Sequence, residues 1–326
     1  MSTTEPTGPR PGRRRVLQGA AAIAGAQLAA PFLLSARGEV PIKIGMVDEM
    51  TGPMTGKACK WNVFRICGTT SMDAASITGT LIRKFGKRWF MITPDYAYGH
   101  TLQAAFIRDV KKLGGTVEAV VIPQTTLDFT ATLIRAKLYK PTVLINNMYG
   151  QPQVDCMKQF LQFGLEKSIA LGGAVFELED VIATPPAAQT GWWNFEWWWN
   201  QPGVPHVAAF NAAIEKKYHV MPSARVWFGY VAVHSFRLAA EHSKGLDALK
   251  MARALEGMEL PPEVALQPGK VFYRKADHQL MANIFVGEVH PPKGNKFNIF
   301  TPHKLVPGQD VAGSAADNGC HMTYPS

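Results

Sequence analysis

The stretch WNVFRICGTTSMDAASITGTLIRKFGKRWFMITPDYAYGHTLQAAFIRDVKKL, residues 61–113, decides the fold of this chain. Its pattern predicts a strand over 61–66, a helix over 72–85, a strand over 88–93, a turn over 95–100 and a helix that ends at Gly114. Apolar strands that alternate with amphipathic helices are typical of a parallel sheet. Ligands of such sheets bind where the strands end, so we expect the turn over 95–100 to lie at a binding site.

The same alternation continues along the chain. We expect strands over 117–122, 142–146, 169–172 and 191–199, and helices over 129–138, 154–163, 178–183, 207–218, 225–242 and 246–255. Two further strands, over 270–273 and 282–289, flank a turn and are expected to pair antiparallel. The predicted fold class is therefore α/β.

The first residues predict a signal peptide over 1–36. Residues 12–18 match the twin-arginine export pattern, and the apolar run 20–34 is too short for a comfortable membrane span. The alternative, a basic disordered tail, leaves the apolar run unexplained. Four arginines and one glutamate of this segment account for three of the nine net positive charges. Elsewhere the basic residues are dispersed, so nucleic-acid binding is not indicated.

The four cysteines, Cys59, Cys67, Cys156 and Cys320, have the spacing of neither a zinc site nor a redox Cys-x-x-Cys pair. A strand between Cys59 and Cys67 would hold them about 26 Å apart, whereas a disulfide needs Cα atoms about 5.5 Å apart. We expect Cys156 to be a buried thiol. Cys320 is expected to tether the C-terminal tail to the body, with Cys59 as its candidate partner.

Motifs of catalysis are missing from the sequence. It contains no Gly-x-Gly-x-x-Gly, no Walker A loop and no Gly-x-Ser-x-Gly elbow. Asp277 and His278 are best explained by hydrogen bonding in a turn. Glu177 and Glu179 suit acid–base work, but a helix N-terminus explains them equally well. We predict no catalytic residue, no cofactor and no metal site, and thus not an enzyme.

Short motifs resemble those of the leucine/isoleucine/valine-binding proteins and occur in the same order. They are Ile42-Lys43-Ile44-Gly45, Met50-Thr51-Gly52-Pro53, Val63-Phe64-Arg65, Asp95-Tyr96-Ala97-Tyr98-Gly99, Asn147-Met148-Tyr149-Gly150 and Gly229-Tyr230. Residues 192–199, 273–279 and 320–322 resemble the twin-arginine-exported branch of that family. The resemblance implies a type I periplasmic binding protein with two Rossmann-like lobes and parallel sheets. Such a protein closes on a small ligand and presents it to an ABC permease of the inner membrane, here as a monomer.

The resemblance also implies a ligand site. Tyr98 and Tyr149 match tyrosines that contact the ligand in the family, and Ala174 occupies the position of the acidic residue that pairs with an ammonium group. Glu177 follows three residues later. A buried ammonium without a carboxylate partner is costly, so an amide or a carboxylate is favoured over a free amino acid. The predicted ligand-binding set is Tyr98, Tyr149, Ala174, Phe176, Glu177, Thr69 and Thr70.

One part of the family pattern is missing. Met50-Thr51-Gly52-Pro53 runs directly into Met54-Thr55-Gly56-Lys57, where the family has several βα units. We therefore expect a truncated first lobe over 41–145, with 270–306 returning near the hinge, a second lobe over 146–269 and a loose tail over 307–326. Ligand binding is expected to be weakened or abolished. A ligand-sensing module of the same fold and an exported α/β hydrolase are the alternative functions.

Overall fold

The computed structural model describes residues 51–325, and its centre is one seven-stranded sheet in the order β2-β1-β3-β4-β5-β8-β9. The bounds are β1 (Arg88–Pro94), β2 (Thr116–Ile122), β3 (Val143–Asn146), β4 (Ala170–Gly172), β5 (Trp192–Phe195), β8 (Ile284–Val289) and β9 (Phe300–Val306). β1 to β5 are parallel, whereas β8 and β9 join antiparallel. The predicted α/β class with a mostly parallel sheet is confirmed. The signal peptide predicted over 1–36 and the motif Ile42-Lys43-Ile44-Gly45 lie outside the described residues.

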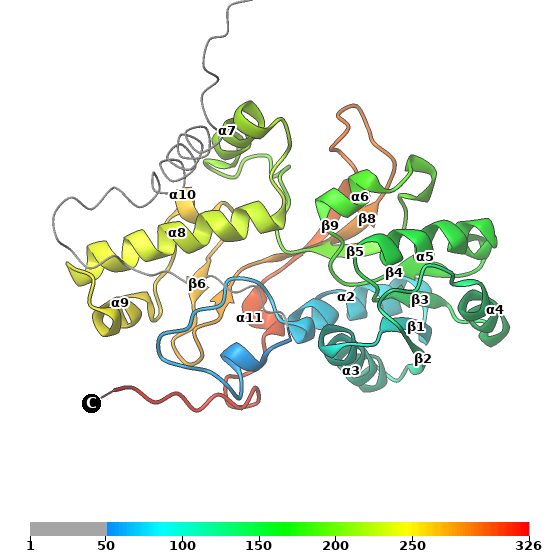
Figure 1. Cartoon of the computed structure of the whole chain (residues 1–326), viewed down its shortest axis with the longest axis horizontal. Helices are drawn as coiled ribbons and strands as arrows, with labels where there is room; N and C mark the ends of the chain where they lie inside the picture. The colour runs from blue at the N-terminus through cyan, green and yellow to red at the C-terminus, as the bar shows by residue number, and fades with distance from the viewer. Residues whose placement is uncertain (1–50, 326) are drawn as a thin grey trace, which may run out of the picture. The chain divides into compact units, whose positions relative to one another are not determined.

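Helices cover both faces of this sheet (Figure 1). One face carries α2 (Thr70–Phe85) and α3 (Ala97–Lys112), and the other carries α4 (Thr130–Tyr139), α5 (Gln151–Gln162) and α6 (Leu178–Ala183). Alternate residues of β1 serve the two cores. Trp89 and Met91 pack toward α2 and α3, and Phe90 and Ile92 pack toward α4 and α5. Burial on both faces explains why this strand is apolar throughout.

A second group of elements surrounds a short hairpin. It contains α7 (Val207–Tyr218), α8 (Ala224–Ser243), α9 (Ala248–Leu255) and α10 (Pro262–Ala265), with β6 (Phe272–Tyr273) paired antiparallel to β7 (Leu280–Met281). Its core includes Trp197, Trp227, Val231 and Tyr273. We name residues 70–195 and 284–306 the sheet group, and residues 197–282 the helical group. No second parallel sheet occurs within residues 51–325, and no helix of this range has both the length and the apolar character of a membrane span.

The strand predicted over 61–66 is wrong. Within this segment Arg65 alone forms a bridge, to Gln279. Its N–H donates to His278 O at 3.1 Å, and Leu280 N–H donates to Arg65 O at 2.8 Å. Phe64 stacks on the buried His278 ring with the centroids 3.9 Å apart. A strand needs a neighbour along its whole length, and this segment finds one at a single residue.

The strand predicted over 191–199 ends early, at Phe195, because the chain then leaves the sheet. Trp198 stays in the core beside the sheet, but Trp197 enters the core of the helical group. Trp197 Nε1 donates there to Leu266 O at 2.8 Å. The strand predicted over 282–289 starts at Ile284, and β9 was not predicted.

The boundary expected between residues 145 and 146 does not separate two sheets. It falls within β3, and β3 pairs directly with β4, from Val143 with Ala170 to Ile145 with Gly172. The chain instead passes between the sheet group and the helical group near Gly68, Glu196 and Asn283, which line one small cavity of about 10 Å³.

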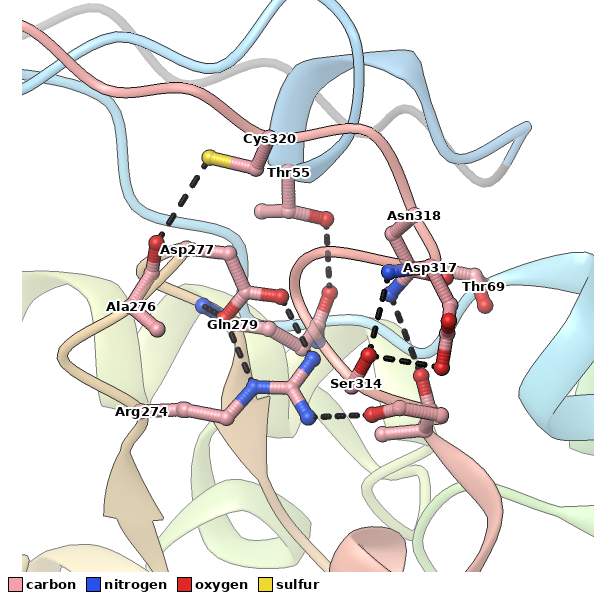
Figure 2. Close-up of polar contacts among 12 residues, drawn as sticks. Thr55, Thr69, Arg274, Ala276, Asp277, Gln279, Ser314, Asp317, Asn318 and Cys320 are labelled. Atoms are coloured by element: carbon pink, nitrogen blue, oxygen red, sulfur yellow. Dashed lines mark hydrogen bonds and ion pairs between the residues drawn. The ribbon is translucent and has the colours of Figure 1, made fainter.

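The tail after residue 306, expected to be loose, is tied down (Figure 2). The predicted disulfide between Cys59 and Cys320 is present, and Cys67 and Cys156 are buried thiols, as expected for Cys156. α11 (Gly308–Val311) starts the tail. Arg274 Nη1 donates to Gly313 O at 2.5 Å, and Tyr324 Oη donates to Glu256 Oε1 at 2.7 Å. The partners of the tail are distant in sequence, so local composition does not reveal them. The expectation of a loose tail rested on that composition alone.

Candidate functional site

Two tyrosines meet where neighbouring strands of the sheet end. Tyr98 lies in the first turn of α3, directly after β1, and Tyr149 lies between β3 and α5. Their ring centroids are 6.5 Å apart in an edge arrangement, and Tyr96 lies 5.7 Å from Tyr98. Tyr98 is 9% exposed, whereas Tyr149 is 39% exposed. The structure therefore brings the two predicted tyrosines together, one as a buried support and one facing solvent.

Both phenols stay protonated at neutral pH. Burial raises the pKa of Tyr98 well above its ordinary value, and the charge of Asp73 raises it further. Burial also raises the pKa of Tyr149, with an added effect of the Glu177 charge. A protonated phenol donates a hydrogen bond, so these side chains suit an oxygen acceptor on a ligand.

The loop after β4 carries three more predicted residues, and it divides them between two cores. Ala174 is buried in the same cluster as Tyr98. Phe176 packs in the opposite core, 4.7 Å from the ring of Trp193. The Phe176 side chain thus lies in the other core from Tyr98, and its contact with a ligand stays a prediction.

Glu177 begins α6 as its N-cap residue and is buried. Its carboxylate forms an ion pair with Arg225, with Oε1 3.0 Å from Nη2. Burial raises the pKa of Glu177, followed by the charges of Glu196, Glu179 and Asp180, and burial lowers the pKa of Arg225. The site thus disfavours both charges, and each partner compensates the other.

We name Tyr98 and Tyr149 the tyrosine wall, and the two predicted threonines lie at the start of α2. Thr69 caps this helix and accepts a hydrogen bond from Met72 N–H at 3.2 Å. Thr70 Oγ1 donates to Thr101 Oγ1 at 3.2 Å, and Thr101 Oγ1 donates to Tyr98 O at 3.0 Å. Thr70 is buried and joins α2 to α3 through Thr101, whereas Thr69 is half-buried and caps its own helix.

Three polar residues near this site were not predicted: Asp73, Asn194 and Glu196. Asp73 is fully buried, and its Oδ2 has no hydrogen-bond partner among the described residues. Burial raises the pKa of Asp73 well above its ordinary value, and the charges of Glu196 and Glu177 raise it further. Burial raises the pKa of Glu196 to about 7, against a hydrogen bond from Gly68 N–H and the charge of Arg65. The signal was present, since Asn194 and Glu196 interrupt a run of aromatic residues that is otherwise apolar.

The other candidate features, which are a cavity, a charged pair and possible metal ligands, do not add to this site. A cavity of about 250 Å³ lies between Pro268, Lys270, Met281, Leu305 and Gln309, and no predicted site residue lines it. Asp277 pairs with Arg274, as a turn residue does. Within residues 51–325 no group of three or more His, Cys, Asp and Glu side chains is placed to hold a metal ion.

Comparisons with known proteins agree with this architecture. The family model described as periplasmic binding protein matches residues 54–296. A periplasmic binding protein from Burkholderia mallei is 23% identical, with a TM-score of 0.74 over 93% of this chain and 78% of that chain. The leucine-, isoleucine-, valine-, threonine- and alanine-binding protein from Brucella ovis, in a closed conformation, is 18% identical, with a TM-score of 0.73 over 94% of this chain and 80% of that chain.

A solute-binding protein of an ABC transporter from R. palustris, solved in complex with benzoate, is 18% identical. Its TM-score is 0.68 over 79% of this chain and 69% of that chain. At identities this low, the structural similarity establishes a shared fold only. No curated protein matches the chain in sequence.

Proposed function

The chain belongs to the periplasmic binding protein family, and we propose that it is the solute-binding component of an ABC transporter of the branched-chain amino acid type. One observation carries the proposal. Tyr98 and Tyr149 lie 6.5 Å apart at the ends of the adjacent strands β1 and β3, where ligands of parallel sheets bind. A ligand held there would bridge to the helical group and favour a closed arrangement.

The ligand class follows from the donors and charges of this wall. Protonated Tyr98 and Tyr149 offer hydroxyl donors, Ala174 offers no charge, and Glu177 is already paired with Arg225. A small amide, a carboxylate or an amino-acid-like compound fits these donors. Two proteins of similar structure support this set of classes: the R. palustris protein is in complex with benzoate, and the Brucella ovis protein binds amino acids.

We further propose that one lobe is the sheet group and that the helical group is what remains of the other lobe. Residues 53–69 hold a 3-10 helix at Pro53–Thr55 and irregular chain in place of βα units. The chain also spans 78% of the Burkholderia mallei protein. An internal deletion after residue 53 accounts for both facts and predicts weakened ligand binding, since one wall of the site is reduced.

Export by the twin-arginine route, residence in the periplasm, a transient contact with an inner-membrane permease and a monomeric state complete the proposal. The support for export is the sequence of residues 12–36, together with family membership.

Thermal-shift measurements test the function. The panel is leucine, isobutyramide, benzoate and 4-hydroxybenzoate, each at 1 mM. A compound with a Kd of about 10 μM would stabilise the protein by about 2.7 kcal/mol, which is readily detected. The same panel is applied to a version with the βα units of a relative restored after residue 53.

A shift in the restored version alone would support both the function and the deletion. No shift in either version would refute the proposed function. Calorimetric binding at micromolar or better Kd by the unaltered chain would refute the weakened binding.

A further inference from the structure

The loop after β4 contains a residue in an unfavourable backbone conformation. Val175 has φ of +56°, in the left-handed region. A β-branched residue rarely adopts this region, because its side chain collides with the neighbouring carbonyl group. Four other non-glycine residues with positive φ, Lys140, His219, Lys244 and Leu266, are helix C-caps, where this conformation is common. Val175 has no such role, so something else must hold it.

Asn194 provides the hold, from the neighbouring strand β5. Val175 N–H donates to Asn194 Oδ1 at 2.5 Å. The other end of the same amide is fixed, because Nδ2 donates to Asp73 O at 3.1 Å and to Ser76 Oγ at 2.9 Å. Asn194 is fully buried. One side chain therefore connects the first turns of α2 with the loop that carries the site residues.

The left-handed turn decides where the loop residues lie. Ala174 and Val175 pack in the cluster of Tyr98, and Phe176 then enters the core on the other face. Glu177 follows immediately as the N-cap of α6, paired with Arg225. An extended residue at position 175 would alter this division, because successive side chains of an extended chain point to opposite sides.

We propose that Asn194 is a positioning residue of the ligand site, which holds residues 174–177 in a strained conformation and thereby sets Ala174 and Glu177 beside the tyrosines. This rests on the proposed function for its meaning, but the geometry can be tested without a ligand. Strain persists where the surroundings impose it, and it is concentrated at binding sites.

The first experiment compares Val175→Gly with Val175→Ala. Both variants lose nearly the same buried side chain, so the comparison isolates the backbone preference. Glycine accepts positive φ freely and alanine does not. We expect the glycine variant to melt about 2 °C above the alanine variant. The opposite order, which is normal at an extended position, would overturn the inference.

The second experiment measures amide hydrogen exchange in α6, whose N-cap depends on the loop. Asn194→Ala should raise exchange of the Val181 amide about tenfold. Adding Val175→Gly should restore most of the protection, because glycine keeps the turn without help. Adding Val175→Ala should not. Unchanged exchange in Asn194→Ala, or equal rescue by glycine and alanine, would show that Asn194 is merely a satisfied core residue.

Gln189→Ala is the matched control. Gln189 is also buried, and its Nε2 donates to Val181 O at 2.8 Å and to Thr184 O at 2.9 Å, at the other end of α6. This variant should lose protection without any rescue by Val175→Gly. If Asn194→Ala does not fold, the comparison of the two Val175 variants still decides.

The benzoate and leucine arms of the panel separate this inference from the proposed function. A probe that shifts the melting temperature of the restored version should bind about tenfold more weakly after Asn194→Ala, with recovery on adding Val175→Gly. If no probe binds, the proposed function fails, while the exchange and melting results still decide the role of Asn194.

Discussion

The disulfide between Cys59 and Cys320 offers the sharpest test of how the tail is held. It joins residues 261 positions apart. A cross-link over this separation restricts the unfolded chain, and loop-closure entropy gives an upper value of about 5.5 kcal/mol at 25 °C. Measured contributions are commonly about 2–4 kcal/mol, in part because the native tail also gains freedom when the bond is absent. We expect Cys59→Ser with Cys320→Ser to lower the free energy of unfolding by about 3 kcal/mol.

Thermal unfolding followed by circular dichroism measures this change. For a protein of this size, a loss of about 3 kcal/mol lowers the melting temperature by about 6–10 °C. Dithiothreitol should lower the wild-type value to that of the double variant and leave the double variant unchanged. Tyr324→Phe is the control for a noncovalent contact, since it removes the hydrogen bond to Glu256 and should cost about 1 kcal/mol or less.

Two results would refute the reasoning. A fall of less than about 2 °C in the double variant would mean that the cross-link does not restrict the unfolded chain as calculated. Equal sensitivity of both proteins to dithiothreitol would mean that the reductant acts elsewhere. Figure 2 shows contacts near Cys320 that do not involve its sulfur, including Arg274 with Asp277 and Thr55 with Gln279.

Two further perturbations have defined outcomes. Burial raises the pKa of Glu196 to about 7 from an ordinary 4.5, so the folded protein binds this proton more tightly than the unfolded chain does. The resulting contribution to the free energy of unfolding is full below pH 4.5 and is lost as the pH rises through 7. Glu196→Gln should therefore reduce the fall in melting temperature between pH 5 and pH 8, and parallel pH profiles would contradict this. A Cβ at Gly99, in the first turn of α3, would collide with Pro94 O at the end of β1. Gly99→Ala should therefore lower the free energy of unfolding, measured with denaturant, by about 2–3 kcal/mol. Gly229→Ala in α8 meets no atom within 4 Å and should instead gain about 0.5–1 kcal/mol, and equal effects of the two substitutions would show that close approach is not the cause.

Local periodicity was enough to predict most of the sheet group. The bounds of α6, Leu178–Ala183, agree with the prediction, and β1 agrees to within one residue; in the helical group the bounds of α7, Val207–Tyr218, also agree. These elements are set by burial patterns that recur every two or about 3.6 residues, which a sequence displays directly. The wrong prediction of a strand over 61–66 arises because strand formation also depends on contacts that are distant in sequence. The apolar pattern is there, but a strand also needs a neighbour, and Arg65 finds one in Gln279 only after the chain has folded.

The site was predictable in the same partial way. Tyr98 and Tyr149 follow predicted strands, so the topology alone brings them together. Asn194 was missed because its role lies in contacts with Asp73 and Ser76, 121 and 118 positions away. No local rule reports such a partner. A polar residue in a fully buried strand is nevertheless a usable signal, because burying an unpaired amide is costly and a partner must exist.

The position of the site within the fold indicates that the order of the tyrosine wall and the affinity for a ligand depend on different parts of this chain. Three contacts that arrange the tyrosine wall and its neighbouring loop lie in the sheet group: Thr70 with Thr101, Thr101 with Tyr98, and Asn194 with Val175. These contacts do not depend on the helical group, apart from Arg225 on Glu177. On the proposed function, a shortened partner lobe therefore weakens binding without disordering the wall that remains. Restoring the βα units should then raise affinity while amide exchange in residues 174–183 stays the same. A change in that exchange on restoration would show instead that the wall is completed by the other lobe, and that Asn194 does not set it alone.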